Sequence, residues 1–459
     1  MGKGAGTGDL GLLSDRMEKP AADSIIPLNL GDMHNVEQLL NDVRIPQFVR
    51  VKQHHACNEL GNATEKLMSE IGKVVMNEGL KLDGKKIAVA VGSRGIFGID
   101  RIVSTTVQAV RDLHAIPFIV PAMGSHGGAT SEGQTDVLAG LGVTGSLVGA
   151  PVVSSMTVQS VGVIDGTIPV YVDDNVLKSD GVVLINRIKP HTGFRGIVES
   201  GLTKMSVIGL GKQKSAEICH RIGYTNFDQR LLAMSKMVFS KVPILFGIAV
   251  IEDAYHRTAD IIAIRGHDIH AAEPGLLAKA RELMPRIFFN PLDIIIIDQV
   301  GKEISGAGMD ANVTGRFHST YGWHQQRVNR VVVLSLTDMS EGNGVGLGLA
   351  DIITSRVARA INLGKTYMNA LTLCDPSAGK LPLVMANDCY AIKAAIKTAN
   401  TLKGDLDLRI VRIKNTLKLD EVFVSEALLP DATHNSFIEV LDHPRDFRFN
   451  RDGTLEEVW

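Results

Sequence analysis

The chain has 459 residues, a formal net charge of −2 and 45% hydrophobic residues, which predicts a globular protein of two or three domains. The near-neutral charge and the 5% aromatic content argue against nucleic acid as a partner. The longest apolar runs, such as VPILFGIAVI, are about half of the ~20 residues that a membrane span needs, so we expect no membrane partner. Four scattered cysteines without a CxxC pair indicate reduced thiols and a cytoplasmic protein.

The N-terminal half repeats one pattern of strand, glycine-rich turn and helix. We interpret residues 1–24 as a flexible tail, because they lack the apolar core of a signal peptide. Three apolar runs then end in glycine-rich turns that open helical segments: KIAVAV in GSRGIFG, IPFIVPAM in GSHGGAT, and DGVVLINRI in KPHTGFRG. This order is typical of α/β units.

A second block of elements begins near Pro291. The runs LDIIIIDQ and RVVVLSLT predict strands, GLADIITSRVARAIN and CYAIKAAIKTANTL predict helices, and LRIVRIKNT and DEVFVSEALL alternate as edge strands do. We therefore predict an α/β fold of two α/β domains with largely parallel sheets. Residues 25–288 form a cofactor-binding domain, and residues 289–459 form a second domain that closes the cleft. Ligands of such sheets bind beyond the carboxyl ends of the strands, which places a cofactor and substrate cleft between the domains.

Two glycine-rich turns carry the first candidate residues. Arg94 in VGSRGI could grip a carboxylate or a phosphate, although it could equally be a surface arginine. In GSHGGATSEGQ, Ser131 and Gln134 have the spacing of a helix capping box, with Thr130 as an alternative cap. The glycines would let backbone N–H groups approach an anion. His126 beside that helix start would stay neutral, as a general base must, or would simply be a satisfied turn histidine.

Two further stretches supply imidazoles and amines. NRIKPHTGFRG places Lys189 and His191 in one loop, Lys204 follows in GLTKM, and His220 follows in CHR. The gaps between the histidines match no standard zinc spacing, so a metal site would depend on the fold. DQVGKEISGAGMDANVTGRF places Gln299 and Lys302 after a buried-looking strand, in a loop that is either functional or a connection between domains.

Together these stretches resemble the nickel-dependent lactate racemase family over roughly residues 30–440, most specifically in KPHTGFRG, GLTKM and CHR. The resemblance implies that Lys204 binds the cofactor covalently and that His220 coordinates nickel. It matches His126, His191, Arg94, Gln299 and Lys302 with catalytic residues of the family. Val91 stands where the family has an acidic residue, so we expect the contacts on that side to differ.

The resemblance also implies the cofactor, a nickel-pincer nucleotide: a pyridinium-3,5-bisthiocarboxylic acid mononucleotide that holds nickel in a square-planar site. Its nucleotide would be bound by the glycine-rich turns, at Ser93, Gly127, Gly128 and Gly193. Proteins that synthesise the cofactor are expected partners. The sequence does not indicate an oligomeric state.

The implied function is an isomerase, a racemase or epimerase of a lactate-like or larger 2-hydroxy acid, including sugar acids. Proton-coupled hydride transfer would proceed with His126 and His191 as the two bases, while Arg94 and Lys302 hold the carboxylate and the developing keto oxygen. Two other functions stay open. One is a zinc- or iron-dependent hydro-lyase that uses the same histidines, and the other is a non-catalytic protein that binds a nucleotide or a sugar acid.

Overall fold

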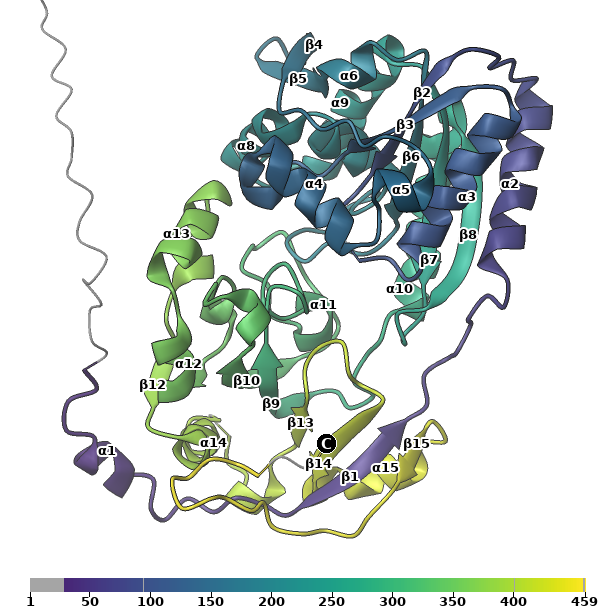
Figure 1. Ribbon diagram of the computed structural model, residues 1–459. Helices are drawn as coiled ribbons and strands as arrows, with labels where there is room; N and C mark the ends of the chain where they lie inside the picture. The colour runs from purple at the N-terminus through teal and green to yellow at the C-terminus, as the bar shows by residue number, and fades with distance from the viewer. Residues whose placement is uncertain (1–28, 94, 400, 457–458) are drawn as a thin grey trace, which may run out of the picture.

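The computed structural model describes residues 29–93, 95–399, 401–456 and 459. The expected tail and the candidate Arg94 lie outside these residues. The described residues form two α/β lobes, each built on its own sheet, with a two-stranded hairpin in the first lobe (Figure 1). The predicted α/β fold with largely parallel sheets is confirmed.

The first lobe is built on a sheet with the strand order β3-β2-β6-β7-β8. The strands are β2 (Lys86–Val91), β3 (Ile116–Pro121), β6 (Gly181–Arg187), β7 (Ile244–Glu252) and β8 (Thr258–Arg265). All neighbours run parallel except β8, which is antiparallel to β7. In β2, Val89 faces one hydrophobic core and Ala90 the other. The sheet is therefore covered on both faces, which is why its strands are almost wholly apolar.

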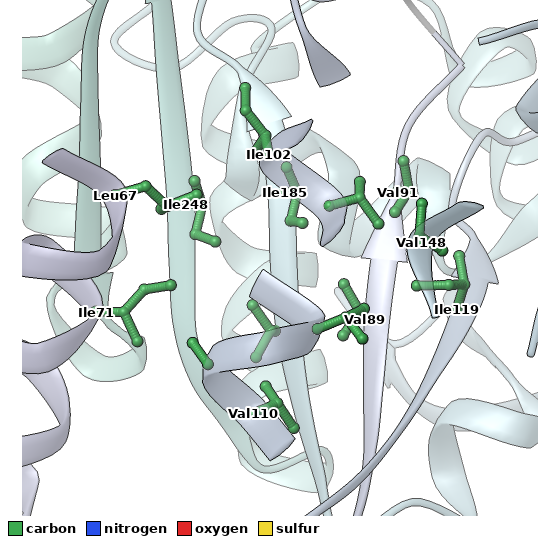
Figure 2. Packing of buried hydrophobic residues seen from close by; sticks show 14 of the residues in the cluster. Leu67, Ile71, Val89, Val91, Ile102, Val110, Ile119, Val148, Ile185 and Ile248 are labelled. Carbon is green, nitrogen blue, oxygen red and sulfur yellow. The ribbon is translucent and has the colours of Figure 1, made fainter. Parts of the chain in front are cut away.

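Helices cover both faces of this sheet. Figure 2 shows Leu67 and Ile71 of α2 (Ala63–Glu78) beside Ile248 of the sheet, and the same hydrophobic core also contains Ile102 and Val110 of α3 (Ile99–Asp112) and Val89 of β2. The opposite core contains residues of α7 (Leu202–Lys204), α8 (Lys212–Ile222), α9 (Phe227–Lys241) and α10 (Ile269–Leu283). The lobe also contains α4 (Ser131–Gly140), α5 (Gly145–Val148), α6 (Asp174–Leu177) and the hairpin of β4 (Val158–Ile164) and β5 (Ile168–Asp173).

The second lobe has the strand order β12-β11-β10-β9-β13-β14-β1-β15. Its strands are β9 (Leu292–Val300), β10 (Val328–Leu336), β11 (Ile352–Thr354), β12 (Leu383–Met385), β13 (Ile410–Ile413), β14 (Glu421–Ser425), β1 (Phe48–Gln53) and β15 (Ile438–Val440). From β12 to β13 the pairing is parallel, and it is antiparallel from β13 onward. Its helices are α1 (His34–Gln38), α11 (Ala311–Thr314), α12 (Ser355–Ala360), α13 (Leu363–Thr372), α14 (Asp388–Lys397) and α15 (Leu429–His434).

The position of β1 differs from the expected division at residue 288. Residues 48–53 belong to the second sheet, where β1 lies between β14 and β15 (Figure 1). For the same reason β13 and β14 are interior strands, although their alternating pattern suggested edge strands. Strand pairing is decided by long-range contacts, and a local pattern does not contain that information. Among the described helices, none combines the length and apolarity that a bilayer crossing requires.

Candidate functional site

A cavity of about 550 Å³ lies where the carboxyl ends of the first sheet's strands meet the second lobe. The residues after β2, β3, β6 and β7 form most of its wall, and residues 302–306 and Leu417 of the second lobe complete it. Five predicted site residues line this cavity: Ser93, His126, His191, Lys204 and Lys302. The carboxyl ends of the parallel strands therefore border a cavity whose volume is within the size range of small-molecule sites.

His126 lies in the turn that follows β3. Its Nδ1 is hydrogen-bonded to the Ser93 hydroxyl, so Ser93 orients the imidazole. The capping box of Ser131 and Gln134 is wrong, and the alternative cap is confirmed: the Thr130 hydroxyl caps α4 by accepting from the Gly133 N–H at 3.0 Å. Gln134 is instead fully buried and donates to the Gly124 carbonyl at 2.8 Å.

His191 lies in the loop between β6 and α7, and this loop is tied down at several points. The His191 N–H donates to Glu199 at 2.6 Å, and the Gly193 N–H donates to His191 Nδ1 at 3.0 Å. Because Nδ1 accepts, the neutral ring carries its proton on Nε2. Arg195 donates to the His191 carbonyl at 2.7 Å and pairs with Glu199, which also accepts from Arg281. These contacts hold the backbone of the His191 loop in place.

Lys204 is the last residue of α7, a single turn that continues into a π turn at Met205–Gly209. Glu273 of α10 holds the start of this turn, since its carboxylate accepts from both the Thr203 N–H and the Thr203 hydroxyl at 2.8 Å. π turns are frequent at functional sites. The segment thus places Lys204 in the cavity wall.

His220 lies in α8 behind the cavity wall and is not among the lining residues. Burial, together with the positive charges of Lys204 and His318, lowers the pKa of His220 to about 4. Its buried Nδ1 has no hydrogen-bond partner within the described part of the chain. A neutral imidazole with an unpaired nitrogen near Lys204 has the chemistry of a metal ligand.

Lys302 follows β9 and brings a positive charge from the second lobe. Its Nζ donates to the Gly306 carbonyl at 2.9 Å and to Asn369 Oδ1 at 2.8 Å. Gln299, the other candidate here, still belongs to β9, and its N–H donates to the Lys414 carbonyl. Gln299 is not a lining residue of the cavity.

The glycines predicted to bind the cofactor have other neighbours. Gly127, Gly128 and Gly193 are not lining residues. A Cβ on Gly127 would lie 2.4 Å from the Gly133 backbone, and one on Gly193 would lie 3.0 Å from the Tyr224 hydroxyl. Close packing therefore accounts for two of these glycines, while Gly128 has a φ of 64° and open space around it.

Sequence reasoning missed several lining residues. Arg187 and Glu252 form an ion pair at the ends of β6 and β7, and His256 lies in the turn that follows β7. Burial lowers the pKa of His256. The lobes are joined beside them by Lys189, whose Nζ lies 2.7 Å from the Asp310 carboxylate. The strand-end rule that found His126 would also have found Glu252 in the stretch IAVIEDAYH.

No group of three or more His, Cys, Asp or Glu side chains in the described ranges is arranged to hold a metal ion. In particular, His126, His191 and His220 do not gather into a three-histidine site. Arg94 falls outside the described residues.

Comparisons with known proteins give only distant likenesses. No protein-family model and no curated protein matches the sequence. A Thermotoga maritima protein known from its crystal structure has a TM-score of 0.45 and 13% identity, over 61% of this chain and 71% of its own. The lactate racemase apoprotein from Thermoanaerobacterium thermosaccharolyticum has a TM-score of 0.44 and 12% identity, over 81% of this chain and 99% of its own. Likenesses this distant carry no argument about activity.

Proposed function

We propose that the protein is a racemase or epimerase of 2-hydroxy acids that works with a nickel-pincer nucleotide bound through Lys204. One observation carries the proposal: one cavity between the lobes has His126 and His191 in its lining, together with Lys204 and Lys302. The sequence resemblance in KPHTGFRG, GLTKM and CHR supports the same reading. Several titratable side chains that line one cleft are typical of a catalytic site rather than of a purely structural one.

The residues present fit the proposed cofactor. Lys204 lines the cavity, as a covalent attachment point must. His220 lies outside the cavity lining, but it keeps a neutral imidazole with a buried Nδ1 that has no partner among the described side chains and backbone, so it would serve as the protein's ligand to the nickel. When bound, the pincer nucleotide supplies an acceptor for the hydride that leaves C2 of the substrate.

The chain's own residues would handle the protons and the substrate's charge. His126 and His191 follow β3 and β6, which are the two neighbours of β2 in the sheet. Adjacent strands are ~4.8 Å apart, so the two imidazoles start from strand ends ~10 Å apart. One imidazole would take the hydroxyl proton of one stereoisomer, and the other would take that of its mirror image. Ser93 orients His126, while the Lys302 ammonium would pair with the substrate carboxylate.

Intact-mass spectrometry tests the proposal. The protein is coexpressed with the enzymes of pincer-nucleotide synthesis, beside Lys204→Ala and the control Lys214→Ala, which removes an exposed lysine of α8. We expect a covalent mass gain in the wild type and the control, and none in Lys204→Ala. No gain in any of the three under active synthesis contradicts the proposed cofactor.

The same preparations separate the other two functions. A zinc- or iron-dependent hydro-lyase would contain metal without added organic mass, and it would form an unsaturated acid from its substrate. A binding protein would take up a nucleotide or a sugar acid without turnover. A screen of 2-hydroxy acids and aldonic acids, read by chiral chromatography, then identifies the substrate of an isomerase.

A further inference from the structure

A fully buried lysine at the start of α8 has no part in the chemistry proposed above. Lys212 has a solvent exposure of 0% and a left-handed φ of 52°, which is an unfavourable conformation for a side chain with a Cβ. Its Nζ donates to the Pro121 carbonyl and to Gln134 Oε1, the latter at 3.0 Å, and lies 3.2 Å from the Asp173 carboxylate. Removing an ammonium from water costs several kcal/mol, so its position calls for a physical reason.

Gln134 links this lysine to the turn that carries His126. Its side chain is fully buried, and its Oε1 accepts from Lys212. Its Nε2 donates to the Gly124 carbonyl at 2.8 Å and to the His126 carbonyl at 3.4 Å. A single amide thus spans the beginning of the His126 turn, residues 124–130, and holds the backbone of His126 itself.

This turn needs such support because of its composition. Gly124, Gly127 and Gly128 all have φ values between 62° and 66°. Glycine reaches this conformation easily, but it also has many other conformations to lose on folding. The backbone of the His126 turn therefore depends on contacts from outside, and Gln134 supplies hydrogen bonds from α4.

The buried cluster of Lys212, Gln134 and Asp173 also contacts the segment that carries Lys204 and His220. The Asp173 N–H donates to the Leu210 carbonyl at 2.8 Å, directly after the π turn. A Cβ on Gly124 would lie 3.2 Å from Ile208 of the π turn, so the His126 turn packs closely on that segment. Lys212 and His220 lie on one helix, α8. This buried cluster therefore connects the His126 turn with the segment 204–220, and the proposed reaction requires a fixed position of these two parts relative to each other.

We infer that Gln134, held in place by Lys212, is a positioning residue that fixes the His126 turn against the segment 204–220. The inference rests on the proposed role of His126 as a base. A displacement of about 1 Å in a reacting group can reduce turnover ~10²-fold, so a side chain that touches no substrate can still govern the rate.

The sharpest variant is Gln134→Glu. The carboxylate still accepts from Lys212, but an oxygen replaces Nε2 and faces the carbonyls of Gly124 and His126, which it repels. Gln134→Met removes both interactions at similar volume, and it supports the test if the first variant does not fold.

The chain offers a matched control in Gln53 of β1. Gln53 is also fully buried, and its Nε2 donates to two carbonyls, of Leu419 at 2.6 Å and Arg286 at 3.4 Å. Its Oε1 accepts from the Phe288 N–H. Gln53→Glu therefore also places a carboxylate oxygen against two backbone carbonyls, at a position that does not line the cavity.

The main readout is the titration of His126 in the cofactor-free full-length protein, followed by the histidine Cε1–H NMR signals and assigned with His126→Gln. We expect the His126 signal and its titration midpoint to shift in both Gln134 variants and to stay at wild-type values in Gln53→Glu. In the loaded enzyme, kcat should fall about 10- to 100-fold in the Gln134 variants, with KM within about twofold.

The inference is overturned if the His126 signal and midpoint stay at wild-type values in the Gln134 variants while their unfolding midpoints fall as in Gln53→Glu, because Gln134 then acts on stability alone. The proposed function fails in a different way, namely if His126→Gln keeps full turnover on a confirmed substrate. The NMR titration needs no cofactor, so the two failures are separable.

Discussion

Glu273 gives a quantitative prediction about stability and pH. The residue is 1% exposed, accepts two hydrogen bonds from Thr203, and has an Oε1 without a partner among the described residues. Burial raises the pKa of Glu273 from 4.5 to about 7, against the opposing effect of the Thr203 hydrogen bonds. The folded state thus prefers the neutral carboxyl. This contribution is fully present below pH 4.5 and is lost as the pH rises through about 7.

The magnitude follows from the two pKa values. The difference between about 7 and 4.5, at 1.36 kcal/mol per unit, is about 3 kcal/mol in the alkaline limit, and about 2 kcal/mol of it develops between pH 5 and pH 8. Glutamine mimics the protonated carboxyl. Glu273→Gln should therefore gain about 2 kcal/mol in free energy of unfolding relative to the wild type over this range.

Urea denaturation followed by circular dichroism at pH 5 and pH 8 measures this difference. Glu282→Gln, an exposed position on the same helix, is the control. The reasoning is refuted if wild type and Glu273→Gln change in parallel between the two pH values. In that case the Glu273 carboxyl would be equally ionised in the folded and unfolded states.

Three further predictions concern the site and its surroundings. His126→Gln and His191→Gln should each lower kcat of the loaded enzyme by ~10²–10⁴-fold, and wild-type rates in both variants on a confirmed substrate would exclude the two-base scheme. Lys189→Met leaves the Asp310 carboxylate buried without its ion pair, so the free energy of unfolding should fall by about 3 kcal/mol. Adding Asp310→Asn to this variant should restore part of the loss. A loss below ~0.5 kcal/mol in Lys189→Met, which is typical of exposed pairs, would contradict the prediction. Burial raises the pKa of the Cys219 thiol to about 12, so Ellman's reagent should modify the two exposed thiols in the native protein and reach Cys219 only after unfolding; a lower native thiol count in Cys219→Ser would contradict this.

Much of the cavity could be predicted from the sequence, because the polar residues that follow parallel strands lie at the same edge of the sheet. A run such as IPFIVPAM followed by GSHGGAT predicts a buried strand and a turn without any knowledge of neighbours. Once the strands are parallel, their carboxyl ends meet at one edge of the sheet. His126, His191 and Lys302 could therefore be placed in one cavity from strand ends that are far apart in the chain.

Two other predictions were wrong, namely the capping box and the edge strand, because the same local spacing is compatible with more than one structure. Ser131 and Gln134 have the spacing of a capping box, yet Thr130 caps α4 and Gln134 is drawn into the interior by Lys212. The alternating β13 strand reads as an edge strand, yet β14 and then β1 pair beyond it. Lys212 lies 78 residues from Gln134 in the sequence, and the alternating pattern of β13 does not show which strands will pair with it.

The sequence by itself determined the α/β class, the glycine-rich turns after the strands and the side chains that these turns present. These features follow from period, propensity and turn chemistry, which act over a few residues. Only the tertiary structure decided that β1 completes the second sheet, that two glycines serve close packing, and that Glu273, Lys212 and Gln134 support the site from within. Burial and long-range pairing depend on which distant segments meet, and these contacts exist only once the chain has folded.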